Sequence, residues 1–364
     1  MGSDCRALVA ERIREQGPIT VAEFMDLALY APEVGYYARA AQRSGRTGDF
    51  FTSVDVGPVF GALLAERFAA WWRSMGAGRI DLVEVAAGNG RLARDILDAA
   101  ARRDPAFYTA ITVHLVERSA RARAAHPGVL VSHGPRLASS GVTMPAGIHG
   151  IVFANELLDA LPVHLVEMGA AGLSEVYVEL ESGRLVDRPG PLSNPALADY
   201  LSDAGITLGA GARAEINLAA VNWVAGVAAR LRRGFLVLLD YGYEAAELYS
   251  EARARGTLAT YHRHLVDAPD TGVRTGPAWL ADPGSRDLTS HVDFTSVRRA
   301  AERAGLETVA VTTQTRFLLD VLEDSPLVAE FSAPDRLAER LALKTLLMPG
   351  GLGSTLTVMV FAKR

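Results

Sequence analysis

The sequence predicts an α/β fold with a mainly parallel, doubly wound sheet. From residue 80 to residue 160, short apolar runs alternate with helical patterns, with strands expected at 80–85, 111–116, 128–132 and 149–154 and a helix at 90–103. This alternation is typical of βαβ units joined by right-handed crossovers. Further apolar runs extend the sheet, the last two with an antiparallel edge, at 235–239, 306–312 and 355–362.

The first of these strands leads into a small-residue turn that is typical of nucleotide sites. Glu84 stands near the end of the strand, and Gly88 and Gly90 lie in the turn before a helix that begins near Arg91. Glycine lacks a Cβ, so a ligand can lie against the backbone while the chain turns sharply. The first N–H groups of the helix then point at that ligand. The alternative is a turn that serves only packing.

The second strand ends in an acid, Glu117, which stands 33 residues after Glu84. An acid at this place in a doubly wound sheet can accept hydrogen bonds from both hydroxyls of a ribose. A dinucleotide site prefers the spacing Gly-x-Gly-x-x-Gly, whereas this turn has the spacing Ala86-x-Gly88-x-Gly90. Glu84 would also repel a pyrophosphate and attract a cationic methionine group. These residues therefore favour S-adenosylmethionine over NAD as the cofactor.

Composition narrows the class of protein. The chain has 364 residues, of which 49% are hydrophobic and 22% charged, as is usual for a soluble globular protein. The net charge of −5 argues against a nucleic-acid partner, which usually binds a basic surface. The single cysteine, Cys5, excludes an internal disulfide and a thiolate metal site, and no apolar run is long enough to span a membrane. We therefore expect a cytoplasmic protein that binds neither nucleic acid nor a membrane.

The N-terminal part of the chain predicts a helical region placed before the sheet. Two amphipathic helices are expected within 4–30, and a long helix within 58–75. The loop Gly-Asp-Phe-Phe-Thr-Ser between them includes Asp49, Phe50 and Thr52. Either its two phenylalanines fill the core under the long helix, or the loop covers the cofactor.

Acidic side chains follow the strand at 149–154. Asn155, Glu156 and Asp159 stand just beyond its carboxyl end, and open α/β sheets bind their ligands at that edge. If the segment is helical, the two carboxylates share a face. Neighbouring carboxylates raise each other's pKa unless a cation lies between them, and a guanidinium or amine substrate would be such a cation. The alternative is that Asn155 and Asp159 only cap a short helix.

Two stretches interrupt the alternation of strands and helices. The first, at about 163–211, contains a pattern that predicts an antiparallel hairpin, and we expect it to shape the substrate cleft or a homodimer contact. The second, at about 245–293, is rich in histidine and aspartate, but the spacing matches no common metal site, and we predict none. Within it, His291 could accept a proton near neutral pH. Asp293 could share that role or cap the next helix.

Taken in order, these motifs resemble those of the MidA-like family of S-adenosylmethionine-dependent methyltransferases, which includes a mitochondrial arginine methyltransferase. The most distinctive pieces are Asn-Glu-x-x-Asp-Ala-Leu-Pro-Val from Asn155 and His-Val-Asp-Phe from His291. Agreement of all the pieces by chance is not expected. The matching stretches are spread over most of the chain, at 17–25, 35–37, 48–53, 84–90, 154–163, 240–242 and 287–294.

The resemblance implies a Rossmann-like class I methyltransferase sheet of seven strands at 77–364, a helical region at 1–76, and insertions after the fourth and fifth strands over the active site. Carried over by position, it places the methionine part of the cofactor and its ribose at Glu84, Ala86, Gly88, Gly90 and Glu117. It adds four residues to the same pocket, namely Asp49, Phe50, Thr52 and Asn155.

One departure from the family matters. Where the family usually has Gly-Pro-Gly-Arg-Gly, this chain has Ala-Ala-Gly-Asn-Gly from Ala86 to Gly90. The methyl group of Ala86 therefore stands where backbone usually approaches the cofactor.

Four functions remain open. The first is methylation of an arginine in a respiratory-complex subunit or another protein, with Glu156 and Asp159 holding the acceptor and His291 or Asp293 as a second proton acceptor. The second is methylation of a small molecule or a peptide natural product. The third is an assembly factor without turnover, which only Ala86 supports. The fourth, an NAD-dependent oxidoreductase, is disfavoured by the glycine spacing.

Overall fold

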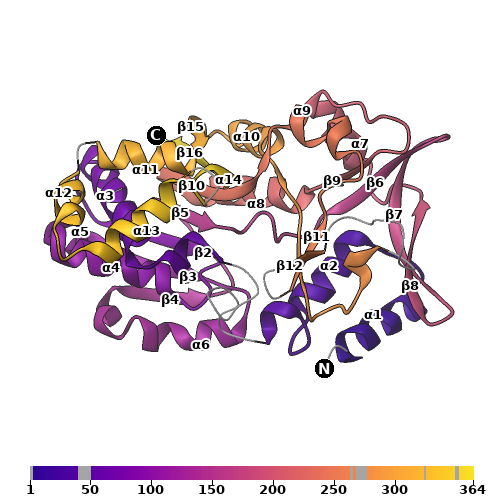
Figure 1. The fold of residues 1–364 in the computed structure, drawn as a ribbon, viewed down its shortest axis with the longest axis horizontal. Coiled ribbons are helices and arrows are strands. Elements are labelled where there is room, and N and C mark those ends of the chain that lie inside the picture. The colour runs from indigo at the N-terminus through magenta and orange to yellow at the C-terminus, as the bar shows by residue number, and fades with distance from the viewer. Residues whose placement is uncertain (1–2, 40–50, 263–264, 268–276, 324, 349–351) are drawn as a thin grey trace.

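The computed structural model describes residues 3–39, 51–262, 265–267, 277–323, 325–348 and 352–364. Two parts lie side by side in Figure 1: a large sheet with its helices on the left, and a smaller β-rich part with the first two helices on the right. Within the described residues, no helix combines the length and the apolar character that crossing a bilayer requires.

A mixed sheet forms the centre of the larger part. Seven strands lie in one hydrogen-bonded path, in the order β15 (Glu307–Thr313), β16 (Leu356–Lys363), β10 (Leu231–Tyr243), β5 (Ile148–Asn155), β2 (Ile80–Val85), β3 (Ile111–Val116) and β4 (Leu137–Gly141). The short β14 (Val292–Asp293) adds an eighth strand beside β10. Neighbours from β10 to β4 are parallel, whereas β16 is antiparallel to β10 and to β15.

The strand order reverses between β2 and β5. From β2 the chain continues outward to β3 and β4, then returns to β5 and proceeds to β10 on the other side. The carboxyl ends of β2 and β5 therefore flank a topological switch point, where open α/β sheets bind ligands.

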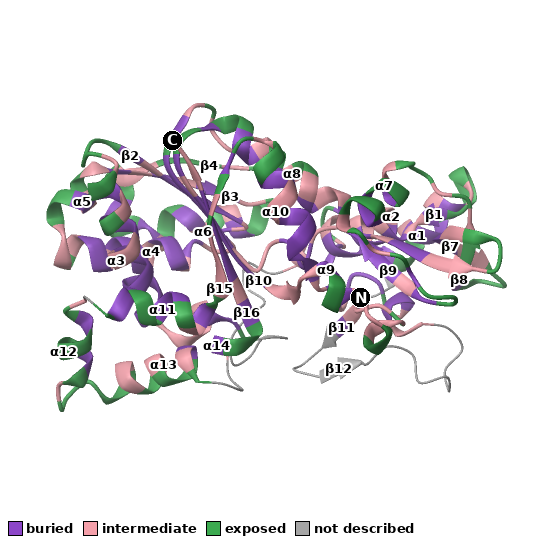
Figure 2. Ribbon diagram, turned by 90° about the horizontal axis from the view of Figure 1, so that it is seen from above, coloured by how far each residue is buried: buried purple, intermediate pink, exposed green. Residues whose placement is uncertain are grey.

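Helices cover both faces of this sheet, so its central strands are buried on both sides (Figure 2). One face packs against apolar residues from α3 (Pro58–Ser74), α4 (Arg91–Arg103), α5 (Pro105–Ala110), α11 (Gln314–Leu322), α12 (Leu327–Ser332) and α13 (Leu337–Leu347). The other face packs against α8 (Leu218–Arg230) and α10 (Phe294–Arg303). Burial on both faces explains why β2 is apolar at successive positions such as Leu82 and Val83. Near the edges lie α6 (Ala120–Val129) beside β4 and α14 (Leu352–Thr355) beside α11.

The smaller part joins the N-terminus to the first insertion. Its sheet has the order β1 (Ile19–Thr20), β7 (Gly172–Glu181), β6 (His164–Gly169) and β9 (Arg213–Ile216), and β8 (Arg184–Gly190) pairs with β7. Apolar residues of α1 (Ser3–Gln16) and α2 (Val21–Tyr30) share a core with this sheet, and α7 (Ala196–Ala204) belongs to a neighbouring cluster. The antiparallel pairing of β1 with β7 fixes α2 against the insertion.

Residues between β10 and α10 add a three-stranded sheet in the order β12 (Leu265–Asp267), β11 (Ala259–His262) and β13 (Asp287–Thr289). A short helix, α9 (Ala245–Leu248), precedes it. The described residues also form 3-10 turns, at η1 (Tyr36–Ala38), η2 (Ser53–Val56), η3 (Val131–Arg136), η4 (Glu251–Arg253) and η5 (Ala278–Leu280).

Most predicted elements are confirmed, and one strand was wrong. The strands at 80–85 and 111–116 and the hairpin at β7 and β8 form as predicted. Residues 128–132, predicted as a strand, instead end α6 and begin η3. The third strand of the parallel run is β4, an edge strand whose middle residues are exposed. Because an exposed edge strand needs no apolar run, it gave no signal in the sequence.

Candidate active site

A cavity of about 650 Å³ opens at the switch point of the sheet. Its wall combines residues that follow β2, β3 and β5 with residues of α2, η1 and β13. The volume is within the range of cofactor and small-molecule sites. The predicted site residues that line it are Thr52, Glu84, Ala86, Gly88, Glu117, Asn155, Glu156, Asp159 and His291. Asp49 and Phe50 lie outside the described residues.

Glu117 and His126 hold the turn after β2 from two sides. Glu117 Oε2 accepts the N–H of Gly88 at 2.9 Å, and Oε1 accepts the N–H of Ser119 at 2.7 Å. The carboxylate keeps acceptor capacity for a ligand hydroxyl beyond these bonds. The Nε2 atom of His126 lies 2.8 Å from the carbonyl oxygen of Gly88, and because a carbonyl only accepts, the imidazole donates there.

Burial sets the charge of these two side chains. It lowers the pKa of His126, whose Nδ1 lies 2.8 Å from Ser140 Oγ, and so favours a neutral ring. Burial raises the pKa of Glu117, and backbone hydrogen bonds from Ser119, Gly88 and Arg118 oppose this rise. Our sequence reasoning missed His126, because a histidine inside an ordinary helix gives no functional signal.

The turn itself uses three residues in the left-handed region. Gly88 has φ +52°, Gly90 has φ +85° and Ala86 has φ +55°. Gly90 was predicted to contact the cofactor, but it lies under the turn: an added Cβ would approach Leu115 Cδ1 at 3.2 Å and His126 Cδ2 at 3.3 Å. Ala86 does line the cavity, and its backbone conformation costs a residue with a Cβ about 1 kcal/mol.

Glu84 connects β2 to the first turn of α4. Its side chain is buried, and Oε2 accepts the N–H of Ala93 at 3.1 Å. Burial raises the pKa of this carboxyl well above its usual value, and the nearby charges of Glu117 and Asp95 add to the rise. A cationic ligand in the cavity would favour the ionised form of Glu84.

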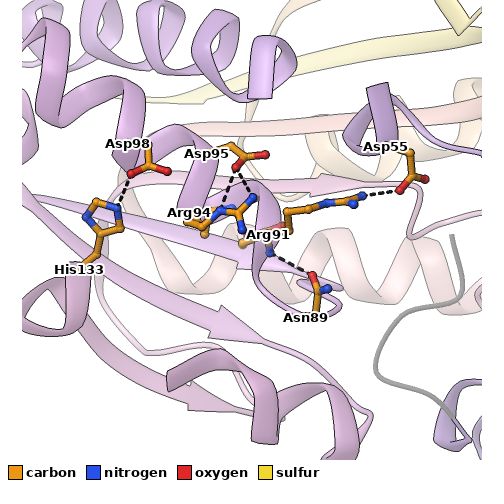
Figure 3. Close-up of polar contacts among 9 residues, drawn as sticks. Asp55, Asn89, Arg91, Arg94, Asp95, Asp98 and His133 are labelled. Carbon is orange, nitrogen blue, oxygen red and sulfur yellow. Dashed lines mark hydrogen bonds and ion pairs between the residues drawn. The ribbon is translucent and has the colours of Figure 1, made fainter. Parts of the chain in front are cut away.

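An ion pair fastens the segment after residue 50 to the start of α4. The N–H and the hydroxyl of Thr52 both donate to Asp55 Oδ2 at 3.0 Å. Asp55 pairs through its other oxygen with Arg91, whose own N–H donates to Asn89 Oδ1 at 3.1 Å (Figure 3). Farther along α4, two more acids pair with Arg94 and His133 in the same view.

The position of Phe51 decides between the two interpretations of the Gly-Asp-Phe-Phe-Thr-Ser loop for this phenylalanine. Phe51 is 38% exposed and lines the cavity, so it does not fill the core under α3. Thr52 lines the cavity beside it.

Beyond the cofactor turn, buried acids gather after β5. Asn155 Nδ2 donates to Glu156 Oε1 at 3.0 Å. Burial raises the pKa of Glu156 to about 8, with Asp240 adding to the rise. Asp240 holds the loop, since its Oδ2 accepts the N–H groups of Leu157 at 3.1 Å and Leu158 at 2.7 Å. Residues 156–160 are not helical, so the condition for a shared helix face is not met, and the helix-cap alternative is wrong.

Four polar atoms in this region are buried and have no hydrogen-bond partner among the described residues. They belong to side chains that line the cavity, and they are Asn155 Oδ1, Asp159 Oδ1, Ser290 Oγ and His291 Nδ1. Asp159 is 9% exposed and Ser290 is 2% exposed. Burial raises the pKa of Asp159 well above its usual value, with Asp240 and Glu156 adding to the rise. Because buried polar atoms in native proteins are nearly always bonded, this group indicates a ligand site.

The two candidate proton acceptors of the second insertion have different surroundings. His291 lines the cavity, and burial and the charge of Arg253 lower its pKa, so the ring is neutral and can accept a proton. Asp293 does not line the cavity. It caps α10, accepting the N–H and the hydroxyl of Ser296 at 3.2 Å and 2.6 Å. Its predicted catalytic role is therefore corrected to helix capping.

Sequence reasoning missed the aromatic wall of the cavity. The hydroxyl of Tyr30 donates to the carbonyl of Ala160 at 2.8 Å, and that of Tyr37 donates to Asp287 Oδ1 at 2.9 Å. Tyr37 and Asp287 both lie in stretches that carried the family resemblance, so the signal was present but gave no role. The stretch at about 163–211, in contrast, contributes none of the described residues that line the cavity.

Comparison with known proteins agrees with this geometry. Residues 63–312 match the model of a family described as "Putative S-adenosyl-L-methionine-dependent methyltransferase". The protein is 29% identical over 333 residues to "Protein arginine methyltransferase NDUFAF7 homolog, mitochondrial" of Drosophila melanogaster, covering 81% of this chain and 69% of that protein. The human protein arginine methyltransferase NDUFAF7 is 29% identical over 329 residues, covering 80% and 67%.

A solved structure covers the whole fold. A Burkholderia thailandensis protein bound to S-adenosyl-homocysteine superposes with a TM-score of 0.84 at 30% identity, covering 100% of this chain and 92% of that one. The family match spans more than half of the chain. The chain therefore belongs to this family, and it is an S-adenosylmethionine-dependent methyltransferase.

Proposed function

We propose that this enzyme methylates the guanidinium group of an arginine in a protein. One observation carries the proposal: buried carboxylates and unpartnered polar atoms gather at the end of the cavity beyond the cofactor turn. Such a group of acids is stable in its ionised form only beside a cation. The curated relatives whose names give an activity are protein arginine methyltransferases, which supports the same acceptor.

The cofactor half of the cavity fits S-adenosylmethionine. Glu117 would hold the ribose, since its carboxylate lines the cavity and keeps acceptor capacity beyond its backbone hydrogen bonds. Glu84 would face the cationic methionine part, and Thr52, Ala86 and Gly88 would line the same half. Asn155, with a free Oδ1, stands where the two halves meet.

Methyl transfer requires the acceptor nitrogen to be aligned and to lose a proton. When bound, S-adenosylmethionine supplies a sulfonium methyl group: a nitrogen–carbon bond forms as the carbon–sulfur bond breaks, and the electron pair leaves with sulfur. Glu156 and Asp159 would hold the guanidinium in line and receive the proton of the reacting nitrogen. His291, neutral and unpartnered at Nδ1, would serve as a second acceptor of that proton.

The strand path and the packing of the N-terminal helices also support a proposal for the domain organisation. We propose that the seven-strand path is the methyltransferase sheet and that 163–211 and 245–293 are insertions after its fourth and fifth strands. Of the N-terminal 76 residues, α3 packs on this sheet, whereas α1 and α2 pack on the first insertion. The helical region is therefore proposed to divide after η1.

The test is to identify the methylated residue without assuming the target. Purified enzyme, methyl-labelled S-adenosylmethionine and a desalted protein extract are incubated, and the protein fraction is hydrolysed to amino acids. The proposal predicts label in methylarginine that is lost with Glu156→Gln, while the exposed variant Glu181→Gln retains it. Label in another amino acid would contradict the proposal. A parallel incubation with an extract that has not been desalted would also contradict it, and favour a natural-product substrate, if label moved from the cofactor only to another small molecule.

A further inference from the structure

Four side chains from separate parts of the chain form a row along one wall of the cavity. The guanidinium of Arg118 lies 4.4 Å from the ring centre of Tyr30. The ring of Tyr30 stacks on that of Tyr37, with centroids 5.4 Å apart and 22° between the planes. The hydroxyl of Tyr37 donates to Asp287 at 2.9 Å, and all four residues line the cavity. Because Arg118 follows Glu117, the row begins beside the proposed ribose site.

Contacts outside the row fix its members. Arg118 makes two hydrogen bonds to Asp26 of α2, at 2.6 Å and 3.2 Å, and the hydroxyl of Tyr30 donates to Ala160 at 2.8 Å. Burial, with the charge of Asp287 adding, raises the pKa of both tyrosines. Both hydroxyls therefore stay protonated and act as donors. Tyr37, together with the N–H of Leu288 at 3.0 Å from the same Oδ1 atom, orients the carboxylate of Asp287.

The far end of the row meets the buried acids after β5. The charge of Asp287 helps to raise the pKa of both Glu156 and Asp159. Asp159 also binds the second insertion, since its carbonyl accepts the N–H of Ser290 at 3.0 Å. The side chains of Asp159 and Ser290 are more than nine-tenths buried and have one unpartnered oxygen each. These oxygens can therefore accept hydrogen bonds from a ligand in the cavity.

We propose that Asp287, oriented by Tyr37, is a specificity-determining residue that binds the guanidinium of the acceptor. This inference rests on the proposed function and extends it to the N-terminal region, which supplies Tyr30 and Tyr37. A guanidinium presents five N–H donors in one plane, which suits several acceptors around it. An ammonium has three donors, and a neutral amide would leave Glu156 and Asp159 uncompensated. Tyr30, Tyr37 and Arg118 are positioning residues.

The test measures acceptor binding and cofactor binding separately. Nα-acetyl-arginine methylamide is titrated by NMR into the complex with S-adenosylhomocysteine, and the lysine and citrulline analogues are titrated in parallel. The wild type is expected to bind the arginine analogue at least about tenfold more tightly than the citrulline analogue. Asp287→Asn is expected to weaken arginine binding by about ten- to one-hundredfold, and Tyr37→Phe by about three- to tenfold. Neither substitution should change the Kd for S-adenosylhomocysteine.

Matched controls lie on β7, away from the cavity. Tyr177→Phe removes a hydroxyl that donates to Pro191 at 2.9 Å, and Glu181→Gln removes a carboxylate that pairs with Arg188. Both controls should bind every analogue as the wild type does.

The outcomes separate the inference from the proposed function. Wild-type affinity for the arginine analogue in Asp287→Asn would overturn the inference and leave the proposed function standing. Loss of S-adenosylhomocysteine binding would show that Asp287→Asn does not fold. The test would then rest on Tyr37→Phe, and wild-type affinity of this variant for the arginine analogue would overturn the inference. A wild type that binds arginine no better than citrulline would overturn the proposed function and the inference with it.

Discussion

The two ends of the cavity differ in how far their polar groups are satisfied. At the cofactor end, Glu84 and Glu117 accept backbone N–H groups, and His126 donates to Gly88. At the acceptor end, Asp159 and Ser290 have buried oxygens without a partner among the described residues. The first end is organised before any ligand binds, whereas the second end has buried oxygens that a bound substrate would satisfy.

The difference follows from how the chain builds each end. The cofactor end comes from one β-turn-α unit and the strand beside it, so its residues are close in sequence and positioned by backbone hydrogen bonds. The acceptor end combines α2, the loop after β5 and β13, which are far apart in sequence. Substitutions at the two ends should therefore affect different steps.

The largest effect is expected at the acceptor end. Glu156→Gln removes the proposed proton acceptor and one charge that holds the guanidinium, so kcat/KM for an arginine acceptor should fall about 10²- to 10⁴-fold. Methyl transfer is measured with labelled S-adenosylmethionine, and cofactor binding by calorimetry. Equal losses in kcat/KM and in cofactor affinity would contradict the claim that the two ends of the cavity serve different steps.

A smaller effect is expected at the cofactor end. Glu117→Gln keeps the shape of the side chain but removes charge-assisted hydrogen bonds to the ribose, so the Kd for S-adenosylhomocysteine should rise about 10- to 100-fold. The acceptor KM, measured at saturating cofactor, should change little. A Kd equal to that of the wild type would show that Glu117 does not hold the ribose.

Stability should depend on pH through the acceptor end. Burial raises the pKa of Glu156 to about 8 and that of Asp240 to about 7, so the folded protein binds these protons more tightly than the unfolded chain. Their contribution to stability is fully present below the usual carboxyl pKa and is lost as the pH rises through 7 and 8. The free energy of unfolding of the ligand-free wild type should therefore fall relative to that of Glu156→Gln from pH 5 to pH 8, by up to about 1.4 kcal/mol per pH unit, and the Tm should fall with it. Parallel Tm curves would contradict this account.

The smallest effect is expected at the turn. Ala86→Gly relieves a left-handed alanine at φ +55°, so it should raise the free energy of unfolding by at most about 1 kcal/mol. Chemical denaturation measures the change, and Ala77→Gly, at φ +55° outside the cavity, is the matched control. A gain in cofactor affinity in Ala86→Gly alone would show that the Ala86 methyl group obstructs the ligand. If Ala86→Gly were less stable than the wild type, the left-handed conformation of Ala86 would not be a source of strain.

The sequence predicted the cofactor end better than the acceptor end for physical reasons. Glu84 and Glu117 were accessible to prediction because strand periodicity and a small-residue turn place them within one local unit. Two roles were left open for Asp293 because an acid before a helix has the same pattern whether it caps or catalyses. Tyr30 could not be given a role, because its place at the cavity depends on how α2 packs against distant strands.

The most direct test is calorimetric titration of S-adenosylhomocysteine into the wild type, Glu117→Ala and Glu156→Gln. The account predicts micromolar binding by the wild type and by Glu156→Gln, and binding weakened beyond about 100-fold in Glu117→Ala. Equal binding by all three proteins, or loss of binding in Glu156→Gln, would contradict a preformed cofactor site that is separate from the acceptor site.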